Sequence, residues 1–210
     1  MVYTLLSGKK FNELYKNNTF CKMLNDDLKH FKYKYKHGEN IDINNFYSYD
    51  ACSEGGLYFC DVNELYRYIL SYGSLFSYVK IPNDAEVYIE KNKFKSNKII
   101  LQKIQHICEL RELKDSNYVL NLIKKNPMSL KYIDEQTKEI CDLAISLDPF
   151  SIQFIKNQTK ELCELAISKD LRTIAHIKNK TREIYEFAAN CVESKKHSLC
   201  AVYIYYDEIY

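Results

Sequence analysis

The sequence predicts an α+β protein, with a small mixed α/β head domain over residues 1–105 and an all-α arm over residues 106–210. Glycine predicts this division, because all 5 glycines lie within the first 73 residues and glycine marks turns and close backbone approaches. Alternating aromatic and lysine side chains predict strands in the head. An internal repeat of 22 residues predicts about three helical hairpins in the arm.

The head alternates between segments of helical and of strand periodicity. Apolar residues recur at helical spacing over residues 10–30, which predicts a helix. Residues 31–36 alternate aromatic and lysine, which predicts a strand with one buried face, and residues 37–40 read as a turn. Asp61 is expected to cap a helix that Gly73 ends in the left-handed conformation. Further strands are expected at residues 56–60, 75–81, 85–89 and 98–102.

The repeat of the arm is visible by self-comparison. Residues 131–146 align with residues 153–168 and, more weakly, with residues 175–189. A unit of this length cannot bury its apolar stripe alone, so successive units are expected to stack as a short α-solenoid. The positions that recur in register are Thr137, Thr159 and Thr181, Ile133, Ile155 and Ile177, and Ala144, Ala166 and Ala188.

Each unit carries start signals for two helices. Asn126 and Asp148 each precede a proline, which places a capping side chain before a residue suited to the first helical position. Thr137 and Thr159 are expected to cap the second helix of their units. The apolar segment at residues 199–210 is expected to cap the last repeat or to pack back on the body.

The cysteines favour neither a metal site nor a disulfide framework. The chain has 8 cysteines but no Cys-x-x-Cys pair, so zinc-ligand spacing is absent. The N-terminal apolar stretch is too short for a signal peptide, and no apolar run reaches the roughly 18–20 residues that a membrane span needs. We therefore expect reduced thiols in a cytosolic protein, with Cys141 and Cys163 buried on the apolar stripe of the repeat.

The charge balance disfavours nucleic acid as a partner. Lys+Arg 30 against Asp+Glu 28 leaves a net charge of +2, whereas nucleic-acid-binding domains are usually clearly basic. In residues 31–36 the lysines lie on the face opposite the aromatics, so the two kinds of side chain cannot form one stacking surface. A second group of lysines is interpreted as a basic surface patch: Lys91, Lys93, Lys95 and Lys98.

The His-Gly dipeptide at His37 and the Gly-Gly-Leu-Tyr-Phe segment around Tyr58 resemble motifs of ADP-ribosyltransferases. This resemblance implies that His37 and Tyr58 hold the nicotinamide end of NAD, with Glu86 or Glu90 as the catalytic acid. A structural interpretation stands beside it. The two glycines would then make a tight entry into a buried strand, and His37 would lie in a solvated turn.

Two stretches resemble uncharacterised proteins of giant viruses of the Mimivirus type. Residues 51–60, 79–87 and 94–101 are similar to a domain that often precedes ankyrin repeats in these viruses. Residues 126–133 and the Gln-Thr-Lys-Glu units are similar to short helical repeats of the same viruses. The resemblance implies no activity, but it implies a setting in the host-cell cytoplasm or the virion.

These observations favour a non-enzymatic protein–protein interaction module without a cofactor. The arm would supply the binding surface for a host or viral protein, because stacked repeats present an extended surface. The candidate binding positions differ between matching repeats: Asp134 against Lys156, Glu135 against Asn157, and Lys178. The alternative is an ADP-ribosyltransferase-like, NAD-binding head that the arm targets.

Overall fold

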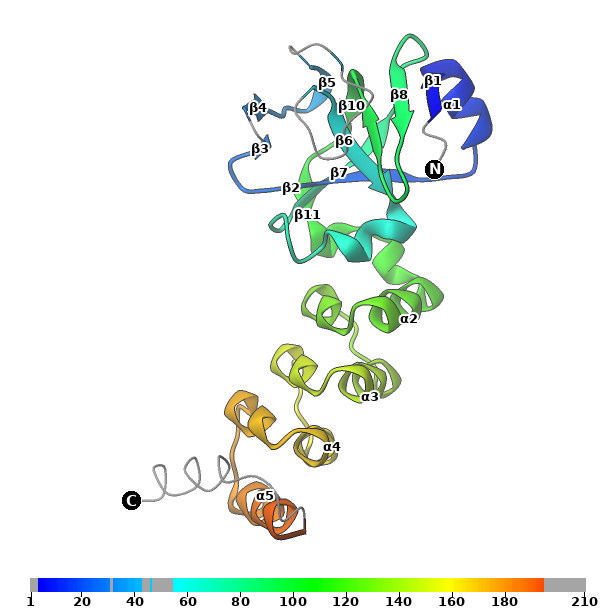
Figure 1. The fold of residues 1–210 in the computed structure, drawn as a ribbon. Coiled ribbons are helices and arrows are strands. Elements are labelled where there is room, and N and C mark those ends of the chain that lie inside the picture. Colours follow the sequence, from blue (N-terminus) through cyan, green and yellow to red (C-terminus); the bar gives the residue numbers. More distant parts are fainter. Residues whose placement is uncertain (1–3, 31, 43–45, 47–54, 195–210) are drawn as a thin grey trace. The chain divides into compact units, whose positions relative to one another are not determined.

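The fold combines an antiparallel sheet with a series of helices, so the predicted α+β class is confirmed at that level. The computed structural model describes residues 4–30, 32–42, 46 and 55–194 (Figure 1). The chain divides into two compact units, Met1–Leu110 and Arg111–Tyr210, here called the head unit and the helical unit. The expected cap at residues 199–210 and the start of the virus-like motif at residues 51–54 lie outside the described residues.

The head unit is built on a nine-stranded sheet in the order β1-β8-β9-β6-β2-β7-β10-β5, with β11 beside β7. β3 and β4 form a separate hairpin, and every strand pairing among the described residues is antiparallel. The strands are β1 (Thr4–Ser7), β2 (Phe20–Leu24), β3 (Lys29–His30), β4 (Tyr33–Lys34), β5 (Gly38–Ile41), β6 (Leu57–Asp61), β7 (Leu75–Lys80), β8 (Glu86–Ile89), β9 (Phe94–Ser96), β10 (Lys98–Leu101) and β11 (Gln105–His106).

Aromatic rings fill the core of the head unit. Helix α1 (Gly8–Leu14) places Phe11 with 0 % exposure against the sheet, where its ring centre lies 5.1 Å from those of Phe20 and Phe94. The rings of Phe59 and Phe94 stack at 5.3 Å. Offset and edge-to-face contacts of this kind stabilise beyond the apolar area they bury.

Several elements of the head unit confirm the sequence predictions. The expected strands appear as β6, β7, β8 and β10. The Asp61 side chain caps the 3₁₀ helix η1 (Val62–Arg67) by accepting from the Asn63 amide, as predicted. Gly73 is left-handed as predicted, with a φ of +95°, but η1 ends at Arg67, so the prediction that Gly73 ends this helix is wrong. The predicted helix over residues 10–30 is wrong beyond Leu14. Its second half forms strand β2, which lies between β6 and β7 and is buried on both faces. Because both faces are buried, apolar and polar residues do not alternate along this strand as they do in a half-exposed one.

The segment after β2 also differs from its prediction. Instead of one strand over residues 31–36, the chain forms the β3–β4 hairpin. The predicted alternation of exposure is still present, because Tyr35 is buried while Lys34 and Lys36 are exposed. The predicted turn is largely β5, where the buried Asn40 side chain bonds the Lys36 amide and carbonyl.

The helical unit alternates 3₁₀ helices (labelled η) with α-helices. The predicted capping residues Thr137, Thr159 and Asp148 accept from backbone amides at the helix starts. Asn126 makes no side-chain capping bond. The helices are η2 (Ile107–Glu109) at the end of the head unit, then η3 (Arg111–Lys114), α2 (Ser116–Lys125), η4 (Pro127–Tyr132), α3 (Lys138–Leu147), η5 (Pro149–Phe154), α4 (Lys160–Lys169), η6 (Leu171–His176) and α5 (Arg182–Ser194).

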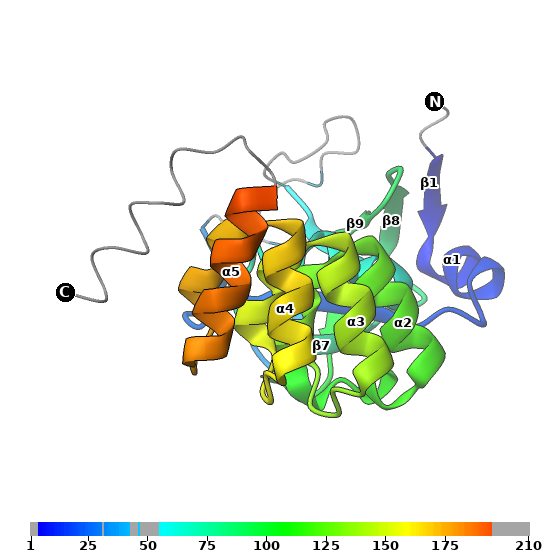
Figure 2. The same ribbon diagram turned by 90° about the horizontal axis from the view of Figure 1, so that it is seen from below.

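Consecutive α-helices of this unit lie side by side in chain order (Figure 2). Two glutamines link one loop to the next with the same hydrogen bonds. The Gln136 Oε1 accepts from the Lys156 amide at 2.8 Å while its Nε2 donates to the Phe154 carbonyl. The Gln158 Oε1 accepts from the Lys178 amide at 2.8 Å while its Nε2 donates to the His176 carbonyl. These contacts join residues 20 or 18 positions apart in the chain.

Candidate functional site

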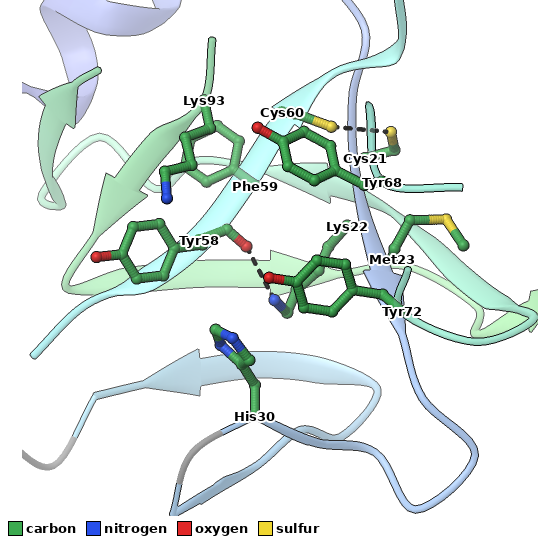
Figure 3. A pocket seen from close by; sticks show the side chains of 10 residues that line it. All are labelled: Cys21, Lys22, Met23, His30, Tyr58, Phe59, Cys60, Tyr68, Tyr72 and Lys93. Carbon is green, nitrogen blue, oxygen red and sulfur yellow. Dashed lines mark hydrogen bonds between the residues drawn. The ribbon is translucent and has the colours of Figure 1, made fainter. Parts of the chain in front are cut away.

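A pocket of the head unit opens where strands β2 and β6 separate (Figure 3). The two strands are in register at Phe20–Asp61 and at Cys21–Cys60. Beyond these pairs, Leu57–Phe59 are in register with β9. The cavity has a volume of about 90 Å³ and is lined by Cys21, Lys22, Met23, His30, Tyr58, Phe59, Cys60, Tyr68, Tyr72 and Lys93.

Lys22 is a buried cation in the wall of this pocket. It belongs to β2 and is only 6 % exposed. Its Nζ donates to the backbone carbonyl of Tyr58 at 3.0 Å and lies 4.3 Å from the ring centre of Tyr35. No carboxylate of the described residues forms an ion pair with Lys22. Burial lowers the pKa of Lys22 to about 7, an effect that Cys60 partly opposes and Lys93 reinforces.

Tyr58 is surrounded by three lysines. Lys22 bonds its carbonyl, the Lys93 Nζ lies 4.4 Å from its ring centre, and the Lys95 Nζ lies 5.5 Å from it. Ammonium groups at this distance are attracted to the ring face. Lys95 has 0 % exposure and the Lys93 side chain is 18 % exposed. The prediction of a surface patch is therefore wrong for these two residues, which strand β9 and the turn before it bring over Tyr58.

The glycine before β6 is required by the same arrangement. Gly56 has a φ of +139°, and a Cβ atom there would collide with the Lys95 side chain. The structural interpretation of this glycine pair, a tight entry into a buried strand, is thus confirmed at Gly56. A larger residue would displace Lys95 from its place over the tyrosine ring.

Lys93 has an acidic neighbour inside the protein, in contrast to Lys22. The Glu90 side chain lies with an oxygen 3.4 Å from the Lys93 Nζ, and Glu90 is 8 % exposed. Its second carboxylate oxygen has no hydrogen-bond partner among the described residues. Glu90 therefore partly neutralises the charge of Lys93, whereas no carboxylate of the described residues does so for Lys22.

The opposite side of the pocket is aromatic and uncharged at neutral pH. The His30 ring centre lies 6.1 Å from that of Tyr58 and 5.7 Å from that of Tyr72. Burial lowers the pKa of His30 to about 4, and Lys22 and Lys93 add to this. Burial also raises the pKa of Tyr68 to about 12. Both groups consequently enter the pocket in their neutral forms.

Two thiols face each other at the last register pair of β2 and β6. The Sγ atoms of Cys21 and Cys60 are 3.8 Å apart. No disulfide joins the six cysteines of the described residues. In the helical unit, Cys141 and Cys163 are buried as predicted, and burial raises the pKa of both thiols.

The structure does not bring His37, Tyr58 and Glu86 together. His37 is exposed and borders a different hollow, beside Tyr33 and Glu39. Glu86 begins β8, is exposed, and accepts a long bond of 3.5 Å from the Asn97 side chain. Tyr58 is 8 % exposed and lies among lysines instead.

The candidate binding positions of the helical unit divide into two groups. The Lys156 Nζ pairs with the Asp134 carboxylate at 2.7 Å, one repeat earlier in the chain. The Lys178 Nζ donates to the Ile155 carbonyl, also at 2.7 Å. These three positions therefore join segments of the helical unit that lie 22 or 23 residues apart in the chain. Glu135 and Asn157 are exposed beside them.

Sequence reasoning did not select Lys22 or His30, although one signal marked the lysine. Lys22 interrupts an otherwise apolar segment, Phe-Cys-Lys-Met-Leu, that forms a wholly buried strand. A lysine inside such a run is rarely fully buried without a partner. His30 carried no comparable signal, because its neighbours in the pocket come from distant parts of the chain.

The comparisons with known proteins concern the helical unit. Residues 115–160 match a family described as a domain of unknown function (DUF4116). No curated protein and no solved structure matches the chain. Within the described residues, no three or more His, Cys, Asp or Glu side chains are grouped to hold a metal ion, and no helix is long and apolar enough to cross a membrane.

Proposed function

We propose that the protein is a non-enzymatic interaction module whose helical unit, a short α-solenoid of 22-residue repeats, binds a host or viral protein. The observation that carries this proposal is the separation of constant and variable positions. The linking contacts of Gln136 and Gln158 are the same in successive repeats, while the exposed neighbours Glu135 and Asn157 differ. Repeat proteins that bind proteins use a constant frame and variable exposed residues in this way.

A second row of equivalent positions supports the same proposal. Met128, Phe150 and Arg172 are the second residues of successive 3₁₀ helices, at 22-residue intervals, and each retains solvent exposure. The Arg172 guanidinium lies 5.4 Å from the Phe150 ring centre, and the His176 ring centre lies 5.7 Å from it. Exposed aromatic and arginine side chains are the types enriched where proteins bind each other tightly.

The sequence resemblance supports a setting for this function. The motifs that resemble giant-virus proteins favour a viral protein that acts in the host-cell cytoplasm or the virion. The match of residues 115–160 to a family of unknown function adds no activity to this proposal. The separate positions of His37, Tyr58 and Glu86 give the NAD-dependent alternative no geometric support.

The experiment is a capture of partners from host-cell extract with the full chain, followed by affinity measurement for the strongest partner. We expect Glu135→Lys and Phe150→Ala each to weaken binding, the second about tenfold because it truncates an aromatic contact. Glu13→Lys is the matched control, since it makes the same charge change on the exposed surface of α1. Equal binding by all three variants, or the absence of a saturable partner, would contradict the proposal.

A further inference from the structure

We propose that the pocket beside Lys22 binds a small organic oxyanion, a carboxylate or phosphate carried on an apolar group. This site lies in the head unit and does not rest on the function proposed for the helical unit.

The Lys22 amine has unused hydrogen-bonding capacity in a buried place. An ammonium group has three donors, and the Tyr58 carbonyl is the acceptor that the described residues offer it. Leaving buried donors of a charged group unsatisfied is costly. An oxyanion in the cavity supplies both the missing acceptors and the missing negative charge, with charge-assisted hydrogen bonds.

The walls of the pocket fit the rest of such a ligand. Met23, Phe59 and the rings of Tyr68 and Tyr72 give the cavity a mostly apolar surface. In Figure 3 the Lys22 amine faces the Tyr58 carbonyl, with the rings of His30 and Tyr72 on either side of it. Small-molecule sites typically combine apolar walls with a few polar groups that fix the ligand. A volume of about 90 Å³ exceeds the space that one water molecule needs.

Binding should take up a proton at alkaline pH. Without ligand, burial keeps much of the Lys22 amine neutral above its lowered pKa of about 7, whereas a bound oxyanion favours the ammonium form. The affinity should therefore fall as the pH rises above about 7. His30, with its pKa lowered to about 4, and Tyr68, with its pKa raised to about 12, do not titrate in this range. The other titratable groups around Lys22 are Cys21, Cys60, Tyr35, Tyr58, Tyr72, Lys93 and, behind Lys93, Glu90.

The test is isothermal titration of the full chain with benzoate, phenyl phosphate and inorganic phosphate. We expect benzoate and phenyl phosphate to bind saturably and more tightly than inorganic phosphate, because only they fill the apolar part. Benzoate keeps its charge between pH 6 and 9, so its affinity isolates the titration of the protein. The affinity for benzoate should fall about tenfold for each pH unit above about 8. Titrations in buffers with different heats of ionisation should show that binding takes up a proton.

Lys22→Met should abolish this binding, and Lys91→Met is the matched control because Lys91 is exposed outside the pocket. Amide hydrogen exchange of β2 peptides verifies that the Lys22→Met variant keeps its sheet. Unchanged benzoate binding by Lys22→Met, equal affinity for inorganic and phenyl phosphate, or no saturable binding of any probe would overturn the proposal.

Discussion

Gln136 and Gln158 of the helical unit and Lys22 of the head unit use their hydrogen-bonding capacity in opposite ways. In the helical unit, Gln136 bonds three backbone carbonyls and one backbone amide, and Gln158 bonds two carbonyls and one amide. In the head unit, the more deeply buried Lys22 has one carbonyl acceptor and no acidic partner among the described residues. A side chain whose capacity is used up holds a structure together, whereas one with spare capacity is suited to bind something else.

The difference predicts opposite signs for substitutions in the two units, with the largest effect at Lys22. Lys22→Met should stabilise the protein at neutral pH, because it removes the cost of burying an amine. The folded pKa of about 7 lies below the ordinary value of 10.5, so the unfolded chain binds this proton at a higher pH than the folded one. Wild-type stability should therefore fall as the pH drops from about 10.5 to about 7, and the variant should lack this fall.

The full fall between pH 10.5 and pH 7 corresponds to up to about 5 kcal/mol, reduced by the lost bond to the Tyr58 carbonyl, and about 2–3 kcal/mol of it lies between pH 9 and pH 6.5. Urea unfolding of both proteins at pH 6.5 and pH 9 measures it, with Lys91→Met as the control for removal of an exposed charge. A variant that is less stable than the wild type at both pH values would show that Lys22 is a structural contact after all, and the contrast between the units would be lost.

The helical unit could be predicted from the sequence more fully than the head unit because its helix signals are local and recur along the chain. The caps Thr137 and Thr159 act within three residues of the amides they bind, so local pattern suffices to find them. Strand β2 was predicted as a helix because its environment is made by β6 and β7, whose residues lie far away in the chain. The pocket depends on the same distant pairings.

The candidate surfaces show the same limit of sequence reasoning. Asp134 and Lys156 are candidates because they occupy matching positions of the sequence repeat with different side chains. In the structure these two side chains form an ion pair with each other. The alternation of charge along a repeat cannot distinguish a contact with a partner from a contact with the next unit. Tyr58 was selected for its motif, but the lysines around it arrive from β2, from β9 and from the turn before β9.

The next effect in size is the loss of a glutamine link. Gln136→Ala should destabilise the helical unit by about 1–3 kcal/mol, because it leaves a half-buried amide and several carbonyls without their partner. Hydrogen exchange at the Lys156 amide, which donates to the Gln136 Oε1, should accelerate strongly while that of Lys178 should change little. Gln153→Ala is the control, since the contact that Gln153 makes within the described residues is with the Phe150 carbonyl of its own turn. Equal losses in both variants would remove the special role of the link.

A smaller effect on stability should distinguish two hydroxyl-bearing residues of the helical unit, Ser151 and Thr173, which lie 22 positions apart in the chain. Thr173 Oγ1 donates to the Asp170 carbonyl at 2.7 Å, while the buried Ser151 hydroxyl, one repeat earlier, has no partner in the described part of the chain. Thr173→Val should cost about 1 kcal/mol, and Ser151→Ala should be neutral or slightly stabilising. Thermal unfolding of the two variants distinguishes them. A clear loss of thermal stability in Ser151→Ala would mean that this hydroxyl makes a hydrogen bond in solution, and would contradict the difference between the two positions.

The smallest effect is expected for the solvent-exposed ion pair between Lys156 and Asp134. The side chains of Lys156 and Asp134 are 55 % and 71 % exposed, so water screens their attraction and the pair should contribute about 0.5 kcal/mol. A double-mutant cycle with Lys156→Ala and Asp134→Ala measures this coupling, which 1 M salt should nearly abolish. Lys178→Ala should cost more and respond less to salt, because its amine bonds the carbonyl of Ile155 instead of an exposed carboxylate. If the Lys156–Asp134 coupling exceeded the loss in Lys178→Ala, exposed charges and not backbone links would set the spacing of the repeats.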